Sequence, residues 1–217
     1  MKKNIQIAID GPASSGKSTV AKIIANDLAI IYLDTGAMYR SATLVSIEEQ
    51  TKNSIEIIDY LKDNPISFEK TSVFIGNRDV TEVIRDNEVT SNVSEISAIP
   101  EIRKFMVSEQ RRIAGSSSII MDGRDIATVV LPNADLKIFL IADVEERAQR
   151  RYKENIKRGI ESDLGYLIEE IATRDKYDST REVSPLKPAE DSIIFDTTGK
   201  SIEEVVAFIE NKAKELK

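Results

Sequence analysis

A run of small residues near the start of the chain carries a lysine and a hydroxyl at a spacing that suits phosphate chemistry. The stretch 11–18 reads GPASSGKS and fits the pattern G-x-x-x-x-G-K-[ST]. Small residues allow backbone N–H groups to turn toward phosphate oxygens, and the start of a following helix adds its positive dipole end. Lys17 is expected to reach the β- and γ-phosphates of a nucleotide, and the Ser18 hydroxyl is placed to ligate Mg²⁺.

The composition limits the other chemistry that the chain can perform. It has no histidine and no cysteine, which removes the usual neutral-pH base, the usual zinc ligand and thiolate chemistry. The formal net charge of −7 argues against nonspecific binding of nucleic acid or of an anionic membrane. No apolar segment approaches the length of a membrane span, and the short N-terminal apolar run is too brief for a signal sequence, so we expect a cytoplasmic protein.

Arginines follow or precede predicted strands at positions that suit a second anion. Arg40 lies in the stretch DTGAMYR and Arg124 in the stretch DGRD, each directly after an apolar run. Ligands of α/β sheets bind at the carboxyl ends of the strands, and guanidinium groups suit phosphate and carboxylate recognition. Arg174 and Arg181 lie ahead of the last apolar run. The sequence therefore predicts a second anion site, as a small kinase requires for its acceptor.

The elements that must position these residues follow an alternating pattern. Short apolar segments bounded by turn residues predict five strands, at 5–10, 30–34, 117–122, 136–142 and 192–196. Helical patterns separate most of them, and the first, Lys17–Leu28, has apolar residues on one face. The last helix begins with a capping box of Ser201 and Glu204. This alternation predicts an α/β fold with a parallel sheet and helices on both faces.

Two sections interrupt the alternation. Residues 65–80 alternate in polarity with Gly76-Asn77 between two short runs, which predicts a hairpin, and we interpret 52–92 as an inserted lobe. Residues 147–159 form an irregular section, in which six basic residues stand against one acidic residue between positions 147 and 158. We interpret this local positive charge as part of a short lid, with a solvated basic helix as the alternative.

Other classes of nucleotide-binding protein fit the sequence less well. A GTPase would carry N-K-x-D, whereas Asn211-Lys212 is followed by Ala213-Lys214. The stretch DTTG at 196–199 is interpreted as a turn before the last helix and not as a switch motif. A motor or an AAA-type ATPase would need a longer chain. A small kinase remains, and a regulatory module that binds a nucleotide without transfer is the alternative from a different class.

The order of segments along nearly the whole chain resembles the bacterial cytidylate kinase family, which phosphorylates CMP and dCMP. The phosphate loop is generic, and the diagnostic segments are YLDTGAMYR, NEVTSNVSEISAIPEIR, MDGRDIATVVLP, ERAQRRYKE and RDKYDSTREVSPL. One departure is Ala127, where the family often has glycine. The resemblance implies a three-layer P-loop kinase fold with a five-stranded parallel sheet in the order 2-3-1-4-5. It also implies a core of 1–51 and 93–217, a nucleoside-monophosphate-binding lobe of 52–92 with a small antiparallel sheet, and a lid of about 147–165.

The same resemblance implies roles for individual residues. The residues expected to bind ATP are Gly11, Pro12, Ala13, Ser14, Ser15, Gly16, Lys17, Ser18 and Thr19. The residues expected to bind CMP are Thr35, Arg40, Ser94, Arg103, Arg124, Asp125, Arg174, Asp178 and Arg181. The catalytic residues expected are Lys17, Asp122, Arg124, Arg147 and Arg151, with Mg²⁺ as cofactor on Ser18.

Within the CMP set, three residues resemble those that read cytosine. Asp125 and Ser94 can accept hydrogen bonds from the exocyclic amino group, and Arg103 can donate to N3 and O2. Uracil inverts the pattern at N3 and at position 4, which costs roughly 1–3 kcal/mol per mispaired group.

A chain without histidine is compatible with this reaction, because phosphoryl transfer depends mostly on positioning and charge stabilisation. Asp122 resembles a Walker-B carboxylate that orients either Mg²⁺-bound water or the Arg124 side chain, and both alternatives stay open. We expect ATP and CMP or dCMP as partners, no nucleic acid, no membrane, and a monomer. An adenylate- or shikimate-type kinase is the alternative within enzymes, but the hairpin lobe and the lack of a long lid count against it.

Overall fold

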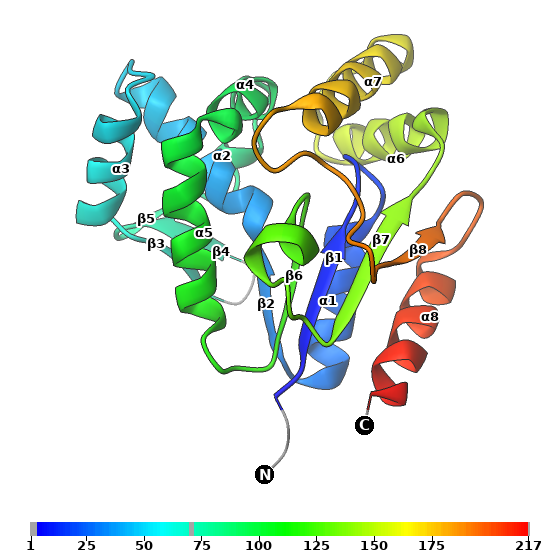
Figure 1. Cartoon of the computed structure of the whole chain (residues 1–217). Helices are drawn as coiled ribbons and strands as arrows, with labels where there is room; N and C mark the ends of the chain where they lie inside the picture. Colours follow the sequence, from blue (N-terminus) through cyan, green and yellow to red (C-terminus); the bar gives the residue numbers. More distant parts are fainter. Residues whose placement is uncertain (1–3, 70–71, 217) are drawn as a thin grey trace. The chain divides into compact units, whose positions relative to one another are not determined.

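Five short apolar strands form one parallel sheet in the order β2-β6-β1-β7-β8 (Figure 1). They are β1 (Gln6–Asp10), β2 (Ile31–Asp34), β6 (Ile119–Gly123), β7 (Leu136–Ile141) and β8 (Ile193–Asp196). Numbered as the five predicted strands, this order is 2-3-1-4-5, which confirms the order implied by the resemblance. The carboxyl ends of parallel strands meet at one edge, so the sheet brings the polar residues that follow different strands to that edge.

The computed structural model describes residues 4–69 and 72–216. Internal contacts divide the chain into two units, the first made of Met1–Tyr32 and Ser116–Lys217 and the second of Leu33–Gly115. The second unit contains the predicted lobe of 52–92, and the limits of that lobe remain a prediction.

In the first unit, helices α1 (Lys17–Leu28) and α8 (Ile202–Glu215) pack on the sheet and on each other. The core between them is formed by branched aliphatic side chains, including Ile7, Ile9, Ile24, Ile138, Leu140, Val205 and Ile209. The predicted capping box of α8 is confirmed, since the Ser201 Oγ accepts from the Glu204 N–H at 3.2 Å. The Glu204 Oε2 accepts in return from the Ser201 N–H at 2.7 Å.

Helices α6 (Val144–Lys157) and α7 (Leu164–Thr180) pack against each other around Ala148, Leu167 and Ile171. The basic section that we expected to be irregular is therefore mostly a regular helix. Ala148, with Val144 and Tyr152, packs in the cluster that α6 forms with α7, while most of the charged residues of α6 are not buried, which is an ordinary amphipathic arrangement. A short π-helix, η2 (Ile126–Val130), follows β6. Across the described ranges, every helix falls short of the length and apolarity that a membrane span requires.

The second unit consists of helices and a small antiparallel sheet. The helices are α2 (Thr35–Glu48), α3 (Ser54–Asp63), η1 (Val83–Arg85), α4 (Asn87–Ala98) and α5 (Pro100–Ala114). The sheet has the order β3-β4-β5, from β3 (Ile66–Glu69), β4 (Ser72–Ile75) and β5 (Arg78–Asp79). Ile75 pairs with Arg78 around Gly76-Asn77, and Gly76 has a φ of 57°, so the predicted two-residue hairpin turn is confirmed.

Candidate active site

The loop between β1 and α1 has a backbone that requires glycine at two positions. Gly11 has a φ of 148°, and a Cβ added there would lie 2.2 Å from the carbonyl oxygen of Leu140 on β7. Gly16 has a φ of 92° directly before α1, and Ser14 has a φ of 58°. Successive residues with these conformations turn backbone N–H groups inward, as an anion cradle requires. The predicted phosphate loop therefore lies between a strand and a helix, in the context that its sequence pattern demands.

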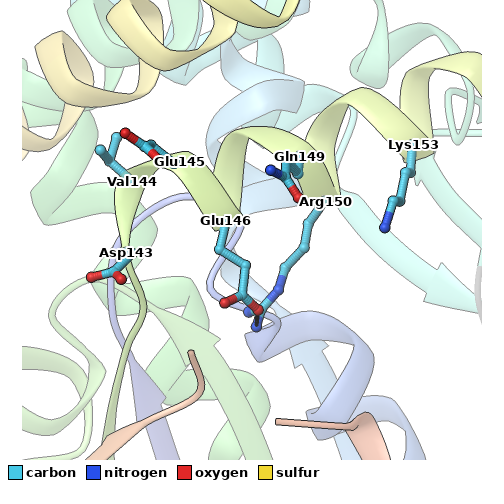
Figure 2. Close-up of a pocket in the computed structure, with 7 residues that line it drawn as sticks. All are labelled: Asp143, Val144, Glu145, Glu146, Gln149, Arg150 and Lys153. Carbon is cyan, nitrogen blue, oxygen red and sulfur yellow. Dashed lines mark hydrogen bonds and ion pairs between the residues drawn. The ribbon is translucent and has the colours of Figure 1, made fainter. Parts of the chain in front are cut away.

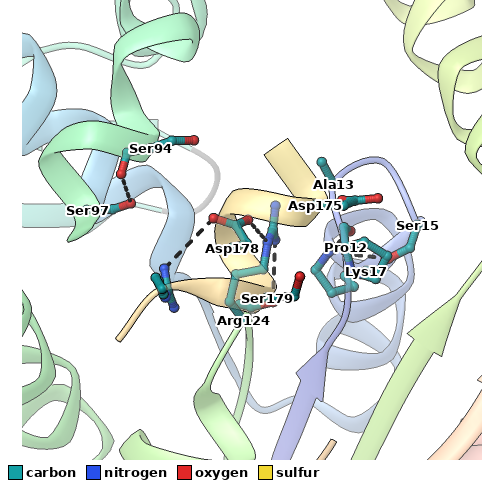
Figure 3. Close-up of polar contacts among 12 residues, drawn as sticks. Pro12, Ala13, Ser15, Lys17, Ser94, Ser97, Arg124, Asp175, Asp178 and Ser179 are labelled. Atoms are coloured by element: carbon teal, nitrogen blue, oxygen red, sulfur yellow. Dashed lines mark hydrogen bonds and ion pairs between the residues drawn. The ribbon is translucent and has the colours of Figure 1, made fainter. Parts of the chain in front are cut away.

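Lys17, the first residue of α1, lies beneath this loop. Its Nζ donates to the Pro12 carbonyl oxygen at 2.6 Å and to the Ser15 Oγ at 3.3 Å, and only 5% of the residue is exposed (Figure 3). Burial, followed by the charge of Arg124, holds the pKa of Lys17 well below its ordinary value. A phosphate on the loop would favour the charged ammonium, because an added anion offsets both causes of the shift.

The Ser18 and Asp122 side chains bring two oxygen atoms together beside the loop. The Ser18 Oγ donates to the Asp122 Oδ2 at 2.7 Å, and the Tyr32 hydroxyl donates to the Asp122 Oδ1 at 2.8 Å. Residues 4–69 and 72–216 contain no group of three or more His, Cys, Asp or Glu side chains that could hold a metal alone. Mg²⁺ commonly takes one or two protein ligands together with waters and phosphate oxygens, so this pair fits the ion when a nucleotide is bound.

Three arginines surround Asp178, and we call Arg124, Arg174, Arg181 and Asp178 the arginine cluster. The Arg124 Nε donates to the Asp178 Oδ2 at 3.0 Å (Figure 3). The Arg181 Nη1 lies 3.9 Å from the Asp178 Oδ1. Burial opposes ionisation of Asp178, but the charges of Arg124, Arg174 and Arg181 outweigh it and hold its pKa below the ordinary value. Three guanidinium groups around one carboxylate leave an excess of positive charge, which suits an incoming anion.

Arg147, a predicted lid residue, is buried at the start of α6 and contacts the phosphate loop. Its Nη1 donates to the Ala13 carbonyl oxygen at 3.2 Å, and its Nη2 lies 2.6 Å from the Asp175 Oδ2 on α7. Arg147 therefore connects the loop to α7 in this conformation. Arg151 lies on the same helix, 3.9 Å from the Glu154 Oε2. The catalytic roles of both arginines remain predictions.

A hollow of about 730 Å³ extends along α6. Its lining residues are Asp143, Val144, Glu145, Glu146, Gln149, Arg150 and Lys153 (Figure 2). Arg150 pairs with Glu146 and donates to the Thr197 Oγ1 at 3.0 Å and to the Thr197 carbonyl oxygen at 2.7 Å. Thr197 belongs to the predicted 196–199 turn, which is confirmed, and its Oγ1 lies 3.4 Å from the Ser15 carbonyl oxygen. The basic helix is thus linked to the phosphate loop through this turn.

In the second unit, Asp34 organises the start of α2. Its Oδ1 accepts from the Ala37 N–H at 2.8 Å, and its Oδ2 accepts from the Arg40 Nη2 at 3.1 Å. A capping carboxylate thereby also orients the arginine that the sequence assigns to the acceptor phosphate. Thr35 is the first residue of α2 and is buried.

The predicted base-reading residues of the second unit lie on two consecutive helices. Arg103, on α5, is buried, donates from Nη1 to the Ser97 carbonyl oxygen at 3.0 Å, and lies over the Tyr39 ring at 5.3 Å. Ser94, on α4, accepts a hydrogen bond at its carbonyl oxygen from the Ser97 Oγ at 3.2 Å. Asp125 lies in the first unit and is buried. The assignment of these three residues to cytosine remains a prediction.

The sequence did not single out two residues that contact the site. Tyr32 had no distinguishing signal, because an aromatic residue within a strand is common. Asp10 did carry one, since it ends a strand directly before the loop, as Asp122 lies near the end of another strand. Asp10 is 1% exposed, and burial raises its pKa to about 7, against the opposing effect of hydrogen bonds from the Ala127 and Ile126 N–H groups.

Comparisons with known proteins cover almost the entire chain. The cytidylate kinase family model matches residues 7–215. The cytidylate kinase of Lactococcus lactis subsp. lactis (strain IL1403) is 64% identical over 218 residues, with 99% of each chain covered. That of Streptococcus thermophilus (strain CNRZ 1066) is 62% identical over 221 residues, with 99% of this chain and 98% of the relative covered.

Solved structures show a more distant likeness. The shikimate kinase of Bacteroides thetaiotaomicron has a TM-score of 0.51 and 12% sequence identity, with 97% of this chain and 98% of that chain covered. At this identity the likeness concerns the fold alone, and it supports the P-loop kinase architecture.

Proposed function

The chain belongs to the cytidylate kinase family, and on that premise we propose that it transfers the γ-phosphoryl group of ATP to CMP or dCMP, which gives ADP and CDP or dCDP. The observation that carries the proposal is the position of Lys17. This lysine hydrogen-bonds to the phosphate loop, and its pKa is lowered first by burial and then by the charge of Arg124, with a smaller effect of Arg174. One cation thus connects a loop suited to a donor phosphate with arginines suited to an acceptor phosphate.

On the donor side, we propose that residues 11–19 bind the triphosphate of ATP through their backbone N–H groups and through Lys17. Ser18 would hold Mg²⁺, which when bound neutralises charge on phosphate oxygens. The hydrogen bond between Ser18 and Asp122 favours the first of the two roles left open for Asp122, orientation of a metal-bound water. Tyr32 supports that carboxylate from the other side.

On the acceptor side, we propose two sets of CMP ligands, each within its own unit. In the first unit these are Arg124, Asp125, Arg174, Asp178 and Arg181. In the second unit they are Thr35, Arg40, Ser94 and Arg103. Arg124 and Arg40 would hold the phosphate, and each already has its guanidinium oriented by a carboxylate, Asp178 and Asp34 respectively. Because the two guanidinium groups are already oriented, phosphate binding loses less side-chain conformational entropy.

The reaction needs no general base, because the acceptor phosphate is already anionic near neutral pH. Lys17 and Arg124 would stabilise the charge that spreads over the transferring group, and Arg147 and Arg151 would add positive charge from α6. The contact of Arg147 with the Ala13 carbonyl oxygen supports its assignment to the donor side. Exclusion of water by a closing lid would favour transfer over hydrolysis of ATP.

The test is an assay of ADP formation with CMP, dCMP, UMP, AMP and shikimate as acceptors. We expect turnover with CMP and dCMP, weaker turnover with UMP, and none above background with AMP or shikimate. ADP formation that is independent of the acceptor would indicate an ATPase, and no turnover with any acceptor would indicate a nucleotide-binding module. Either result would contradict the proposal. Size-exclusion chromatography of the same sample tests the expectation of a monomer.

A further inference from the structure

Helix α7 carries two aspartates about one turn apart, and each pairs with a different arginine of the site. Asp178 accepts a hydrogen bond from the Arg124 Nε. Asp175 lies three residues earlier, with its Oδ2 2.6 Å from the Arg147 Nη2. Residues three apart are neighbours on the surface of a helix, so the two carboxylates belong to the same side of α7. The proposed function uses Asp178 and leaves Asp175 without a role.

Three contacts fix the Arg147 guanidinium, one at each of its nitrogens. The Nε donates to the Ala142 carbonyl oxygen at 2.8 Å, the Nη1 donates to the Ala13 carbonyl oxygen at 3.2 Å, and the Nη2 pairs with Asp175. A guanidinium is planar, so contacts at three nitrogens determine both its plane and its direction. The side chain is therefore held in one orientation beside the phosphate loop.

Asp175 is the charged member of these three acceptors. Arg147 is 5% exposed, and a buried cation is costly unless a counter-ion offsets its loss of hydration. The carbonyl oxygens of Ala13 and Ala142 carry only partial charges. The carboxylate of Asp175 therefore explains why the guanidinium lies at the loop and does not turn to solvent.

A single oxygen of the Asp175 carboxylate makes this ion pair. Within residues 4–69 and 72–216, the buried Asp175 Oδ1 has no hydrogen-bond partner. A bidentate pair, with two parallel N–H···O bonds, would engage both oxygens and would fix the guanidinium more firmly. The contact through one oxygen leaves Arg147 able to turn toward a phosphate oxygen while its counter-ion stays nearby.

We propose that Asp175 is a positioning residue for phosphoryl transfer, which holds the Arg147 guanidinium at the phosphate loop in place to act on the transferring group. The inference rests on the proposed function, because it takes Arg147 as a residue of the donor side. Asp175 touches neither nucleotide and acts through Arg147. Helix α7 then serves both substrates, since Asp175 orients an arginine for the donor and Asp178 orients an arginine for the acceptor.

Asp175→Asn tests this role, because it removes the charge and keeps the size of the side chain and one acceptor oxygen. The experiment measures the single-turnover rate of phosphoryl transfer at saturating ATP and CMP, and KM for each nucleotide from steady-state rates. We expect the single-turnover rate to fall about tenfold, since a charge aimed at the transferring group acts mainly in the transition state. Both KM values should change less than about threefold.

Glu169→Gln is the matched control, since it also removes one negative charge from α7, but at an exposed position. It should leave the single-turnover rate and both KM values as they are in the wild type.

A double-mutant cycle identifies the route of the effect. If Asp175 acts through Arg147, then Asp175→Asn should not lower the single-turnover rate further in an Arg147→Ala background. If circular dichroism shows that Asp175→Asn does not fold, Asp175→Glu replaces it, because it keeps the counter-ion and displaces it by one methylene. A fall of about threefold is then expected, again only where Arg147 is present.

An unchanged or higher single-turnover rate in the variant, a change confined to the KM values, or an equal loss with and without Arg147 overturns the role of Asp175. A wild-type protein without CMP-dependent ADP formation overturns the proposed function itself, whatever the variants do. The two failures are therefore distinguishable in one data set.

Discussion

The phosphate loop and the arginine cluster are both suited to phosphate groups, but they are built in opposite ways. The loop is a continuous stretch whose shape depends on backbone conformation, with Gly11 fixed by the approach of the Leu140 carbonyl oxygen. The arginine cluster joins side chains from distant positions, with Arg124 after β6 and Asp178 on α7, 54 residues apart. The loop consists of consecutive residues, whereas the arginine cluster forms only when the chain has folded.

The loop and the arginine cluster also differ in what fixes their binding groups in place before a ligand arrives. The loop presents backbone N–H groups whose positions are fixed by φ angles, and Lys17 donates to the Pro12 carbonyl oxygen and to the Ser15 hydroxyl. The arginines of the cluster are held by Asp178, whose ionisation they favour. Changes in the loop should therefore affect folding and the chemical step, and changes in the cluster should affect acceptor binding.

The largest effect is expected from Lys17→Ala. The loss of the ammonium removes charge from the transferring group, so kcat should fall about 10³-fold or more while the protein remains folded. Steady-state ADP formation measures the loss, and circular dichroism with thermal melting checks the fold. Wild-type-like turnover would overturn the assignment of the loop to the donor, and with it the contrast between the phosphate loop and the arginine cluster.

A second test concerns the backbone of the loop. Gly11→Ala places a methyl group 2.2 Å from a backbone oxygen at a φ of 148°, so we expect a loss of about 3 kcal/mol or more and a fall in Tm of about 10 °C. Gly199→Ala is the matched control, because Gly199 also has a positive φ, 69°, but no atom lies within 4 Å of the added Cβ. Its cost should be about 1 kcal/mol. Equal melting temperatures for the two variants would contradict the steric argument.

The phosphate loop could be predicted from the sequence because the residues that determine its conformation are close together in the chain. The pattern GPASSGKS, the apolar run before it and the helical periodicity after it fix the loop, and α1 begins and ends at the predicted residues. The parallel sheet follows from the same kind of signal, since alternating apolar runs and helical patterns leave few topologies. Ser201 and Gly76 likewise announced a helix start and a turn through short-range hydrogen bonding and a positive φ.

The arginine cluster could not be predicted from the local pattern of the sequence. Asp178 lies within a polar stretch of α7, where an aspartate is ordinarily a solvated residue, and only the resemblance to a family singled it out. Its burial and its pairing with Arg124 depend on the packing of α7, which no short-range pattern reveals. The same reasoning explains α6, where a run of basic residues concealed the small residue Ala148 that packs against α7.

Within the cluster, Arg124→Ala should raise KM for CMP about 100-fold and change KM for ATP far less. The guanidinium is already oriented by Asp178, so its removal deletes a formed binding group and leaves Asp178 with less positive charge. Initial rates at varied CMP and at varied ATP separate the two effects. Arg112→Ala is the control, because this arginine pairs with Glu109 on the exposed face of α5. A rise confined to KM for ATP would assign Arg124 to the binding of the donor nucleotide and not to the binding of CMP.

Asp125→Ala should lower the CMP/UMP ratio of kcat/KM by about tenfold, because its carboxylate accepts from the amino group that uracil lacks. The measurement compares kcat/KM for the two acceptors at saturating ATP. Asp59→Ala is the control, since Asp59 forms an exposed pair with Lys62 in the second unit. An unchanged ratio in Asp125→Ala would remove this residue from base recognition.

The smallest effect is expected from Tyr32→Phe, which tests how far the loop depends on side chains outside it. The substitution removes the hydroxyl that donates to the Asp122 Oδ1 at 2.8 Å and leaves the hydrogen bond from Ser18 intact. Because the hydroxyl acts through a carboxylate and not on phosphate, we expect the Mg²⁺ concentration for half-maximal activity to rise about threefold, with little change in kcat at saturating Mg²⁺. Tyr166→Phe is the control, since Tyr166 is 65% exposed. If the Mg²⁺ titrations of Tyr32→Phe and the wild type coincide, then Ser18 alone sets the position of Asp122. The chemistry of the phosphate loop, like its backbone conformation, would then not depend on the Tyr32 hydroxyl.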